Sequence, residues 1–185
     1  EKKWQKYASF LLSPVLMALI LSIVIGGYRI KGEYYTKHIL AAKQHNDWQN
    51  LLVYAADARS IFYKIDPTSM PIDWYSGAAH FSLGNVDAAW RDFELAKKQY
   101  PHNPHILNDL ATCYEQKGLR QKAKDTYLES IRIHPTFADP RLNLGAIFFN
   151  EKNYFEAFKW VKSASDDAPR KAVFLEKIEV AIKKQ

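Results

Sequence analysis

The hydrophobic pattern begins with an uninterrupted apolar segment. Residues 7–28 read YASFLLSPVLMALILSIVIGGY and contain no charged side chain. As a helix this segment would extend about 33 Å, and the hydrocarbon core of a bilayer is about 30 Å thick. Tyr7 and Tyr28 lie where interfacial aromatic residues are expected, and basic residues flank both ends. We therefore predict a transmembrane helix over residues 7–28, with the lipid bilayer as its partner.

Two other interpretations of this segment fit less well. A cleaved signal peptide has a shorter apolar run and a cleavage site of the small-x-small type, whereas this run has 22 residues and ends in the poorly matching stretch Ile25–Tyr28. A buried helix of a soluble domain is seldom this long without a charge. Basic residues lie on both sides of the segment, so their distribution leaves its orientation open.

Beyond the apolar segment the pattern becomes periodic, with a period of 34 residues. Three kinds of residue recur in register: a small residue, an alanine twelve positions later, and a proline twelve positions after that. They are Gly77, Ala111 and Gly145; Ala89, Ala123 and Ala157; and Pro101, Pro135 and Pro169, with Pro67 one period earlier. Agreement of several classes of position over three copies indicates repeated helical pairs that stack on their neighbours.

This pattern resembles the tetratricopeptide repeat (TPR), in which a small residue, an alanine, an aromatic residue and a proline recur over 34 residues. The resemblance implies an α-solenoid of three full repeats, 70–103, 104–137 and 138–169. With the transmembrane helix predicted over 7–28, the expected fold is all-α. The small residues would let the two helices of a unit approach closely, and the aromatic side chains of Phe81, Tyr114 and Phe148 would fill the space between units.

The flanks of the repeats are expected to be helical too. Residues 29–67 fit a linker helix and a degenerate first repeat, with an inter-helix turn near Asp47 and a longer second helix, because Pro67 comes late in the repeat. Residues 170–185 fit a capping helix that covers the last repeat, with Val173, Ile178 and Ile182 as its apolar stripe.

The resemblance also implies a binding groove on the first helix of each unit. Carried over position by position, its candidate ligand-binding residues are Trp74, Tyr75, Phe81, Asn108, Asp109, Thr112, Asn143, Phe149 and Asn150. No lysine or arginine occupies these positions, so we expect a protein or peptide ligand of apolar or basic character rather than an acidic tail. The alternative for Trp74 and Phe149 is that they pack between units.

Charge and composition narrow the function. Of the formal charge of +6, a net +3 lies in residues 1–30, which leaves 22 basic and 19 acidic residues interleaved over the rest of the chain. Nucleic-acid binding requires a clustered basic surface, which this pattern lacks, so no nucleic-acid partner is expected.

No catalytic motif is found in the sequence, and no metal site or cofactor is expected. Cys113 is the single cysteine, which rules out an internal disulfide, and its position on the first helix of a repeat favours packing over reactivity. His102, His105 and His134 fall in turns without the cysteine or carboxylate spacing of a metal site.

The order of these segments further resembles the C-terminal part of bacterial O-antigen ligase-family membrane proteins that carry repeat tails. The residues concerned are the membrane helix, Asp47-Trp48, Asp66-Pro67 and the stretch PIDWYSG from Pro71 to Gly77. The resemblance implies a parent enzyme of the bacterial inner membrane that transfers a lipid-linked glycan, with its catalytic part outside this segment and its repeats on the periplasmic side. The alternative is a stand-alone membrane-tethered TPR scaffold or assembly factor with no link to glycan transfer.

Overall fold

The computed structural model describes the backbone of residues 2–184 and the side chains of residues 13–184. Within that range the chain forms nine helices, and β-structure is limited to two isolated bridges. The helices are α1 (Lys2–Gln44), α2 (Trp48–Ala58), α3 (Ile72–Ser82), α4 (Val86–Gln99), α5 (Pro104–Gln116), α6 (Arg120–Ile133), α7 (Ala138–Asn150), α8 (Tyr154–Lys162) and α9 (Lys171–Lys183). The all-α prediction is confirmed. The chain divides into two compact units after Tyr75, and each is described by itself.

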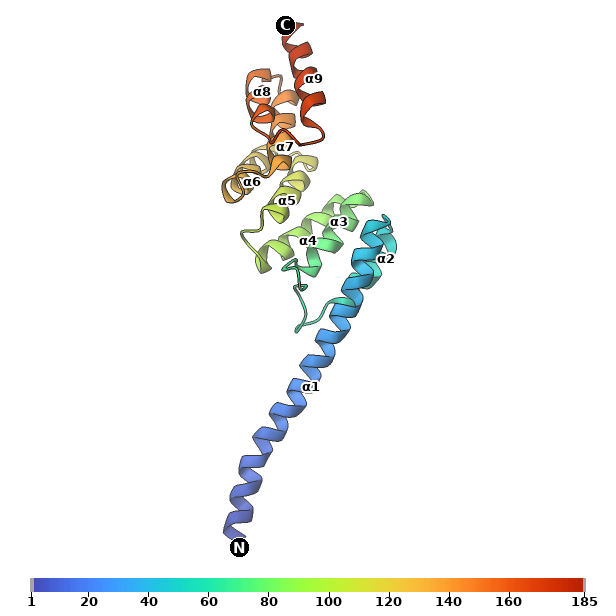
Figure 1. Ribbon diagram of the computed structural model, residues 1–185, viewed down its shortest axis with the longest axis vertical. Helices are drawn as coiled ribbons and strands as arrows, with labels where there is room; N and C mark the ends of the chain where they lie inside the picture. The colour runs from blue at the N-terminus through green and yellow to red at the C-terminus, as the bar shows by residue number, and fades with distance from the viewer. Residues whose placement is uncertain (1, 185) are drawn as a thin grey trace. The chain divides into compact units, whose positions relative to one another are not determined.

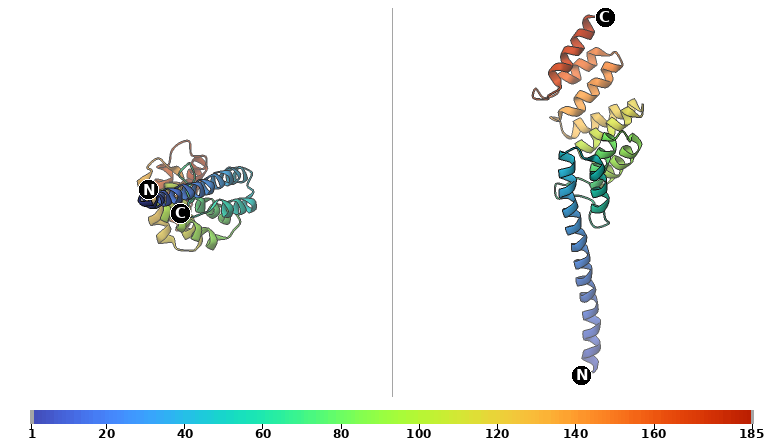
Figure 2. Two further views of the ribbon diagram at one scale, coloured as in Figure 1. Left: turned by 90° about the horizontal axis from the view of Figure 1, so that it is seen from below. Right: turned by 90° about the vertical axis from the view of Figure 1, so that its right-hand side faces the viewer.

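In the first unit, α1 is a single helix of 43 residues that contains the predicted transmembrane segment (Figures 1 and 2). Pro14 lies inside it without ending it. From Ser13 to Gln44 the helix is long and apolar enough to cross a membrane, and none of its most apolar window is buried in protein. The side chains of residues 7–12, the start of the predicted span, lie outside the described residues.

The C-terminal part of α1 packs against α2. Ile39 and Leu51 are fully buried between the two helices, with Ala55 beside them. The turn expected near Asp47 is present: Asp47 caps α2 by accepting a hydrogen bond from the backbone N–H of Asn50 at 3.2 Å. The predicted transmembrane segment therefore continues without a break into a helical hairpin.

The longer second helix predicted for this first repeat is wrong, because α2 ends at Ala58 and the additional residues form a loop over 59–71. Tyr63 anchors this loop to α1, where its hydroxyl lies 3.0 Å from Thr36 Oγ1. A Cβ atom built at Gly32 would lie 2.3 Å from the Tyr63 ring, so only a glycine leaves room for the ring there. Asp66, buried further along the loop, accepts hydrogen bonds from the backbone N–H groups of Thr68 and Met70.

In the second unit the helices from α4 to α9 each pack on the next along the chain, and α3 meets α4 where Gly77 faces Phe93. The turn chemistry is that of helical repeats. Asn103 caps α5 by accepting hydrogen bonds from the N–H groups of His105 and Ile106, and Pro104 occupies the first helical position. Gly84 and Gly118 end α3 and α5 with φ near +80° and +75°, a conformation that favours glycine.

The repeating small residues lie at tight helix crossings. A Cβ atom at Gly77 would come within 2.7 Å of the Phe93 ring, and one at Gly145 within 2.5 Å of Val161 Cγ2. In the middle repeat Ala111 belongs to one fully packed cluster with the Tyr127 ring. In the first and third repeats the small residue meets the larger residue sixteen positions later, and in the middle repeat these two residues share one cluster. The crossings are therefore close, as the 34-residue pattern predicts.

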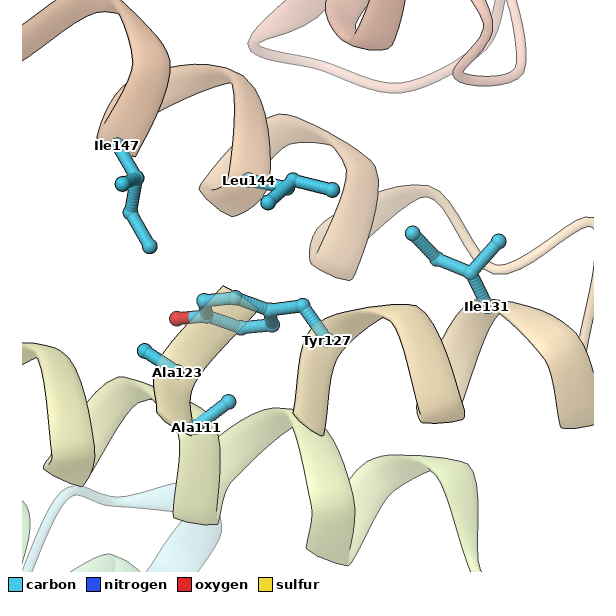
Figure 3. Close-up of a cluster of buried hydrophobic side chains, with 6 residues drawn as sticks. All are labelled: Ala111, Ala123, Tyr127, Ile131, Leu144 and Ile147. Carbon is cyan, nitrogen blue, oxygen red and sulfur yellow. The ribbon is translucent and has the colours of Figure 1, made fainter. Parts of the chain in front are cut away.

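Figure 3 shows how this contact is extended to the next repeat. The Tyr127 ring lies with Ala111 and Ala123 on one side and Leu144 and Ile147 of α7 on the other. All five residues are at most 2% exposed. The core of the second unit is thus shared between neighbouring repeats, so each repeat depends on the next for burial of its apolar surface.

Two details of the predicted packing are wrong. Phe81 does not fill the space between units with Tyr114 and Phe148, because it lies one position later in its repeat and faces an open pocket. In α9 the buried apolar residue is Ile178, whereas Val173 and Ile182 are 70% and 46% exposed. The face that α9 turns toward α8 instead carries Phe174, Leu175 and Ile178. Gln185, the last residue of the predicted capping segment, lies outside the described residues.

We predict that Gly145→Ala destabilises the protein by about 1–3 kcal/mol, because the added methyl group overfills the contact with Val161. Urea unfolding of the two proteins measures this free energy. In a Val161→Ala background the cost should fall below about 1 kcal/mol, since alanine removes the methyl group that the new Cβ meets. An equal cost in both backgrounds would contradict the contact.

Candidate ligand-binding groove

Two of the predicted groove residues belong to the first unit. Tyr75 is 3% exposed, and its hydroxyl donates a hydrogen bond to Asp66 Oδ2 at 2.7 Å. Burial and the Asp66 carboxylate raise the pKa of Tyr75 well above its usual value. Its expected place in an open groove is therefore not observed, since the side chain anchors α3 to the preceding loop. The half-buried Trp74 ring lies under Lys43 Nζ, 4.2 Å from the ring centroid, in a cation–π contact.

The second unit brings three other candidates together. Phe81, Asp109 and Thr112 line one open pocket of about 150 Å³ between α3 and α5. Ala78, Ser82 and Phe93 complete its wall. This pocket combines an aromatic and apolar side with a carboxylate and a hydroxyl group. We call the surface that runs from here along α3, α5 and α7 to α9 the groove.

In the middle of the groove, two asparagine amides and one carboxylate form a chain of hydrogen bonds. Asn143 Nδ2 donates to Asn108 Oδ1 at 3.1 Å, and Asn108 Nδ2 donates to Asp109 Oδ1 at 3.1 Å. Asn108 is buried, whereas Asn143 and Asp109 are partly exposed. The chain joins α5 to α7, and it holds the partly exposed amide of Asn143 in a fixed orientation.

Two hydroxyl groups, those of Thr112 and Tyr127, are hydrogen-bonded next to Asn108. Thr112 Oγ1 lies 3.0 Å from the Asn108 carbonyl oxygen and 2.9 Å from the Tyr127 hydroxyl. Tyr127 also donates to Glu115 Oε2 at 3.4 Å. Burial raises the pKa of the Glu115 carboxyl and that of the Tyr127 hydroxyl. Thr112 is thus tied to the backbone and core of α5 and α6.

A larger pocket of about 420 Å³ lies at the C-terminal end of the groove, between α7 and α9. Its wall is mainly apolar, with two cationic side chains, and consists of Leu142, Asn143, Ala146, Pro169, Arg170, Val173, Phe174 and Lys177. Arg170 forms an exposed ion pair with Asp139 at 3.4 Å. Lys177 Nζ lies 5.0 Å from the centroid of the Phe149 ring.

The cationic residues of this pocket are missing from the predicted site because they come from the capping helix. The sequence signal that could have found them is the spacing of Val173 and Lys177, one helical turn apart and off the buried stripe of α9. Arg170 and Lys177 make this end of the groove basic, although the predicted groove positions on α3, α5 and α7 contain no lysine or arginine.

The remaining two candidates lie at the end of α7. Phe149 packs with Tyr154 of α8 and Phe174 of α9, with ring centroids 5.3 and 5.9 Å apart. This is the packing alternative that the sequence leaves open for Phe149, although the ring stays partly exposed. Asn150 is exposed in the last turn of the helix.

The side chains with potential for chemistry are buried or dispersed. Cys113 is fully buried on α5, and this burial raises the pKa of its thiol to about 12. His80 Nε2 lies 3.8 Å from Asp92. Over residues 13–184, no three His, Cys, Asp or Glu side chains come together as a metal site.

No protein-family model matches the sequence. Solved structures with the same fold include the crystal structure of MamA, with a TM-score of 0.63 and 18% identity over 88% of this chain and 86% of that one. The first TPR domain of Spaghetti (RPAP3) bound to the HSP90 peptide SRMEEVD has a TM-score of 0.57 and 18% identity, over 60% of this chain and 94% of that one. The Sgt2 TPR domain from Aspergillus fumigatus has a TM-score of 0.54 and 20% identity, over 60% and 78%.

These similarities confirm the fold. The helical repeats of this chain form a TPR solenoid, as the 34-residue pattern predicts. At 20% identity or less they show the arrangement of the helices and nothing about the ligand.

We predict that Cys113 is unreactive in the folded protein. With a pKa of about 12, only about one thiol in ten thousand is ionised at pH 8, and the thiolate is the nucleophile. Reaction with a chromogenic disulfide reagent at pH 8 should be at least a hundredfold slower than in denaturing urea. Ser82→Cys, at an exposed groove position on α3, provides the control that should react at once. Rapid labelling of native Cys113 would contradict its burial.

Proposed function

We propose that the chain is a membrane-anchored TPR module that binds an extended peptide segment of a partner protein along the groove of its second unit. The observation that carries this proposal is the hydrogen-bonded chain of the Asn143 and Asn108 amides and the Asp109 carboxylate between two open pockets. An amide side chain can donate to and accept from a peptide backbone, and neighbouring pockets accommodate the side chains of an extended ligand. The peptide-bound RPAP3 structure supports a ligand of this class for the fold.

The charges of the groove define the ligand more closely. The pocket at α3 and α5 contains the Asp109 carboxylate, whereas Arg170 and Lys177 border the pocket at α7 and α9. A complementary segment carries an apolar or basic side chain for the first pocket. For the second it carries an apolar side chain with a carboxylate nearby. This ligand differs from the one predicted from α3, α5 and α7 alone, which has no acidic group.

The membrane anchor is supported by the exposure of α1. Met17 and Ile23 are 69% and 74% exposed, and their large apolar neighbours from Val15 to Val24 are all at least 43% exposed. A continuous helical surface of this kind is stable when lipid covers it, because burial of apolar side chains is favourable and the helix satisfies its own backbone hydrogen bonds.

A more specific assignment rests on the resemblance to the C-terminal part of O-antigen ligase-family proteins. In this form of the proposal the repeats lie on the periplasmic side of a bacterial inner membrane. There they recruit an acceptor or an assembly partner for a glycan-transferring parent enzyme. The reading frame that precedes Glu1 tests the parentage, since further apolar segments are expected in a polytopic enzyme. In a protease-accessibility assay on spheroplasts, periplasmic repeats should be cleaved. The alternative, a tethered scaffold with cytoplasmic repeats, predicts that the repeats are protected.

We predict that Asn143→Ala weakens peptide binding at least tenfold, because the groove loses the amide that faces the ligand backbone. Ligands are selected from a random peptide library on the full chain, and their affinities are measured by fluorescence anisotropy. Leu128→Ala, at a 41% exposed position on α6 away from the groove, is the matched control and should bind normally.

A charge reversal separates specific binding from general loss of structure. Lys177→Glu should weaken selected peptides that contain a carboxylate and leave the thermal unfolding temperature unchanged, because Lys177 is exposed. Unchanged affinity in both Asn143→Ala and Lys177→Glu would contradict binding in this groove.

We predict that the full chain sediments with membranes and resists extraction at high pH. The double variant Ile20→Arg/Ile23→Arg should be released into the soluble fraction, because an arginine at the centre of a membrane helix costs about 2.5–3.5 kcal/mol. Val53→Arg, at an exposed position on α2, is the control that should stay membrane-bound. Extraction of the unaltered chain by carbonate would contradict the anchor.

A further inference from the structure

The loop between α2 and α3 presents apolar side chains beside the end of the membrane segment. Ile61 is 77% exposed and Phe62 is 36% exposed. The ring of Phe62 lies 5.6 Å from that of Tyr28, the last residue of the uncharged segment, and Tyr28 is itself 45% exposed. In Figure 1 and in the right view of Figure 2 this loop runs beside α1, toward the N-terminal part of that helix. The loop therefore reaches the level at which α1 would leave the bilayer.

The tip of the loop is held in place by its neighbours. Ser60 and Tyr63 form an isolated bridge with backbone hydrogen bonds in both directions, and Ser60 Oγ accepts a further bond from the Phe62 N–H at 3.3 Å. Tyr63, on the other side of the tip, fills the notch at Gly32 and is 4% exposed. Tyr63 is fixed on α1 and Ser60 is bridged to Tyr63, so between them Ile61 projects into solvent while Phe62 lies against Tyr28.

The depth of the tip follows from helix geometry. The headgroup region adds about 5–8 Å on each side of the hydrocarbon core, which is about four or five residues of a helix. If the core ends near Tyr28, the headgroup layer extends to about Gly32 and Glu33. Phe62 contacts Tyr28, and Tyr63 contacts Gly32, so the loop tip falls within this layer.

The charges around the tip suit such a surface. Arg29, next to Tyr28, and Lys64, next to Tyr63, are exposed, and Lys31 lies 4.0 Å from Asp57. Aromatic side chains beside lysine and arginine are the usual composition of the membrane–water interface, where a ring can be partly buried while a cation reaches lipid phosphate.

We propose that the tip of this loop, Ile61 and Phe62, inserts into the headgroup layer of the bilayer that α1 spans. The proposal rests on the membrane anchor proposed above and adds a second lipid contact to it. Ile61, Phe62 and Tyr28 form the apolar part of the contact, and Arg29 and Lys64 form its basic border. Two contacts, one spanning and one interfacial, fix the rotation of the first unit about the axis of α1.

Site-specific fluorescence on the full chain in phosphatidylcholine–phosphatidylglycerol vesicles tests this contact. An environment-sensitive NBD label is attached at Ile61→Cys in a Cys113→Ala background. Quenching is then measured with lipids that carry a nitroxide near the headgroup. Val53→Cys, 56% exposed on α2 of the same unit, is the control for the label's own affinity for lipid, and Ile20→Cys in the apolar segment is the control for the span.

The expected result is a blue-shifted emission at position 61 and at least threefold stronger quenching there than at position 53. A label at position 61 that behaves like the one at position 53, while the label at position 20 is buried in lipid, overturns the loop contact and leaves the anchor intact. A water-exposed label at position 20 overturns the anchor and the loop contact together.

Discussion

The second unit depends on one steric relation, the fit of a small residue against the side chain sixteen positions later. Where the first position is glycine, a phenylalanine or a valine fills the space, and where it is alanine, a tyrosine does so. This relation sets how closely the helices of a pair approach, and the filled crossing then presents Tyr127 to the next repeat. Because each pair shares its core with its neighbour, the groove residues on α5 and α7 are held by contacts on the opposite side of the same helices.

The elements that repeat could be predicted from the sequence, since the same local physics recurs three times. Gly77, Ala111 and Gly145 lie at equivalent crossings, where the 34-residue pattern predicts a close approach of two helices. The elements outside the period were harder to predict. In the loop over residues 59–71, Tyr63 packs into the notch at Gly32, a contact between positions far apart in the chain that no local pattern contains. The repeat pattern likewise does not contain the hydrogen bond from Tyr75 to Asp66 of this loop.

The residues that line the centre of the candidate groove were predicted from the sequence, whereas those at its C-terminal end were missed. Phe81, Asp109 and Thr112 meet in one pocket, and Asn108 and Asn143 are joined by a hydrogen bond, because these residues lie on the repeating first helices. Arg170, which immediately precedes α9, and Lys177 of α9 border the end of the groove. The register of α9 depends on how Ile178 packs and on the ion pair of Lys171 with Asp166 at 2.6 Å. An exposed, mixed-charge helix of this kind contains too weak an apolar pattern to fix its own orientation.

The continuity of α1 has a consequence for how the chain can change in length. The helix passes from the apolar segment to the fully buried Ile39 without a proline, a bulge or a turn. A residue inserted or deleted between Tyr28 and Gly32 would rotate everything after it by about 100° and displace it by about 1.5 Å along the axis. An insertion or deletion here therefore keeps the orientation of the following residues about the axis of α1 only when its length is close to a whole number of turns. About seven residues, or two turns, is the closest short length.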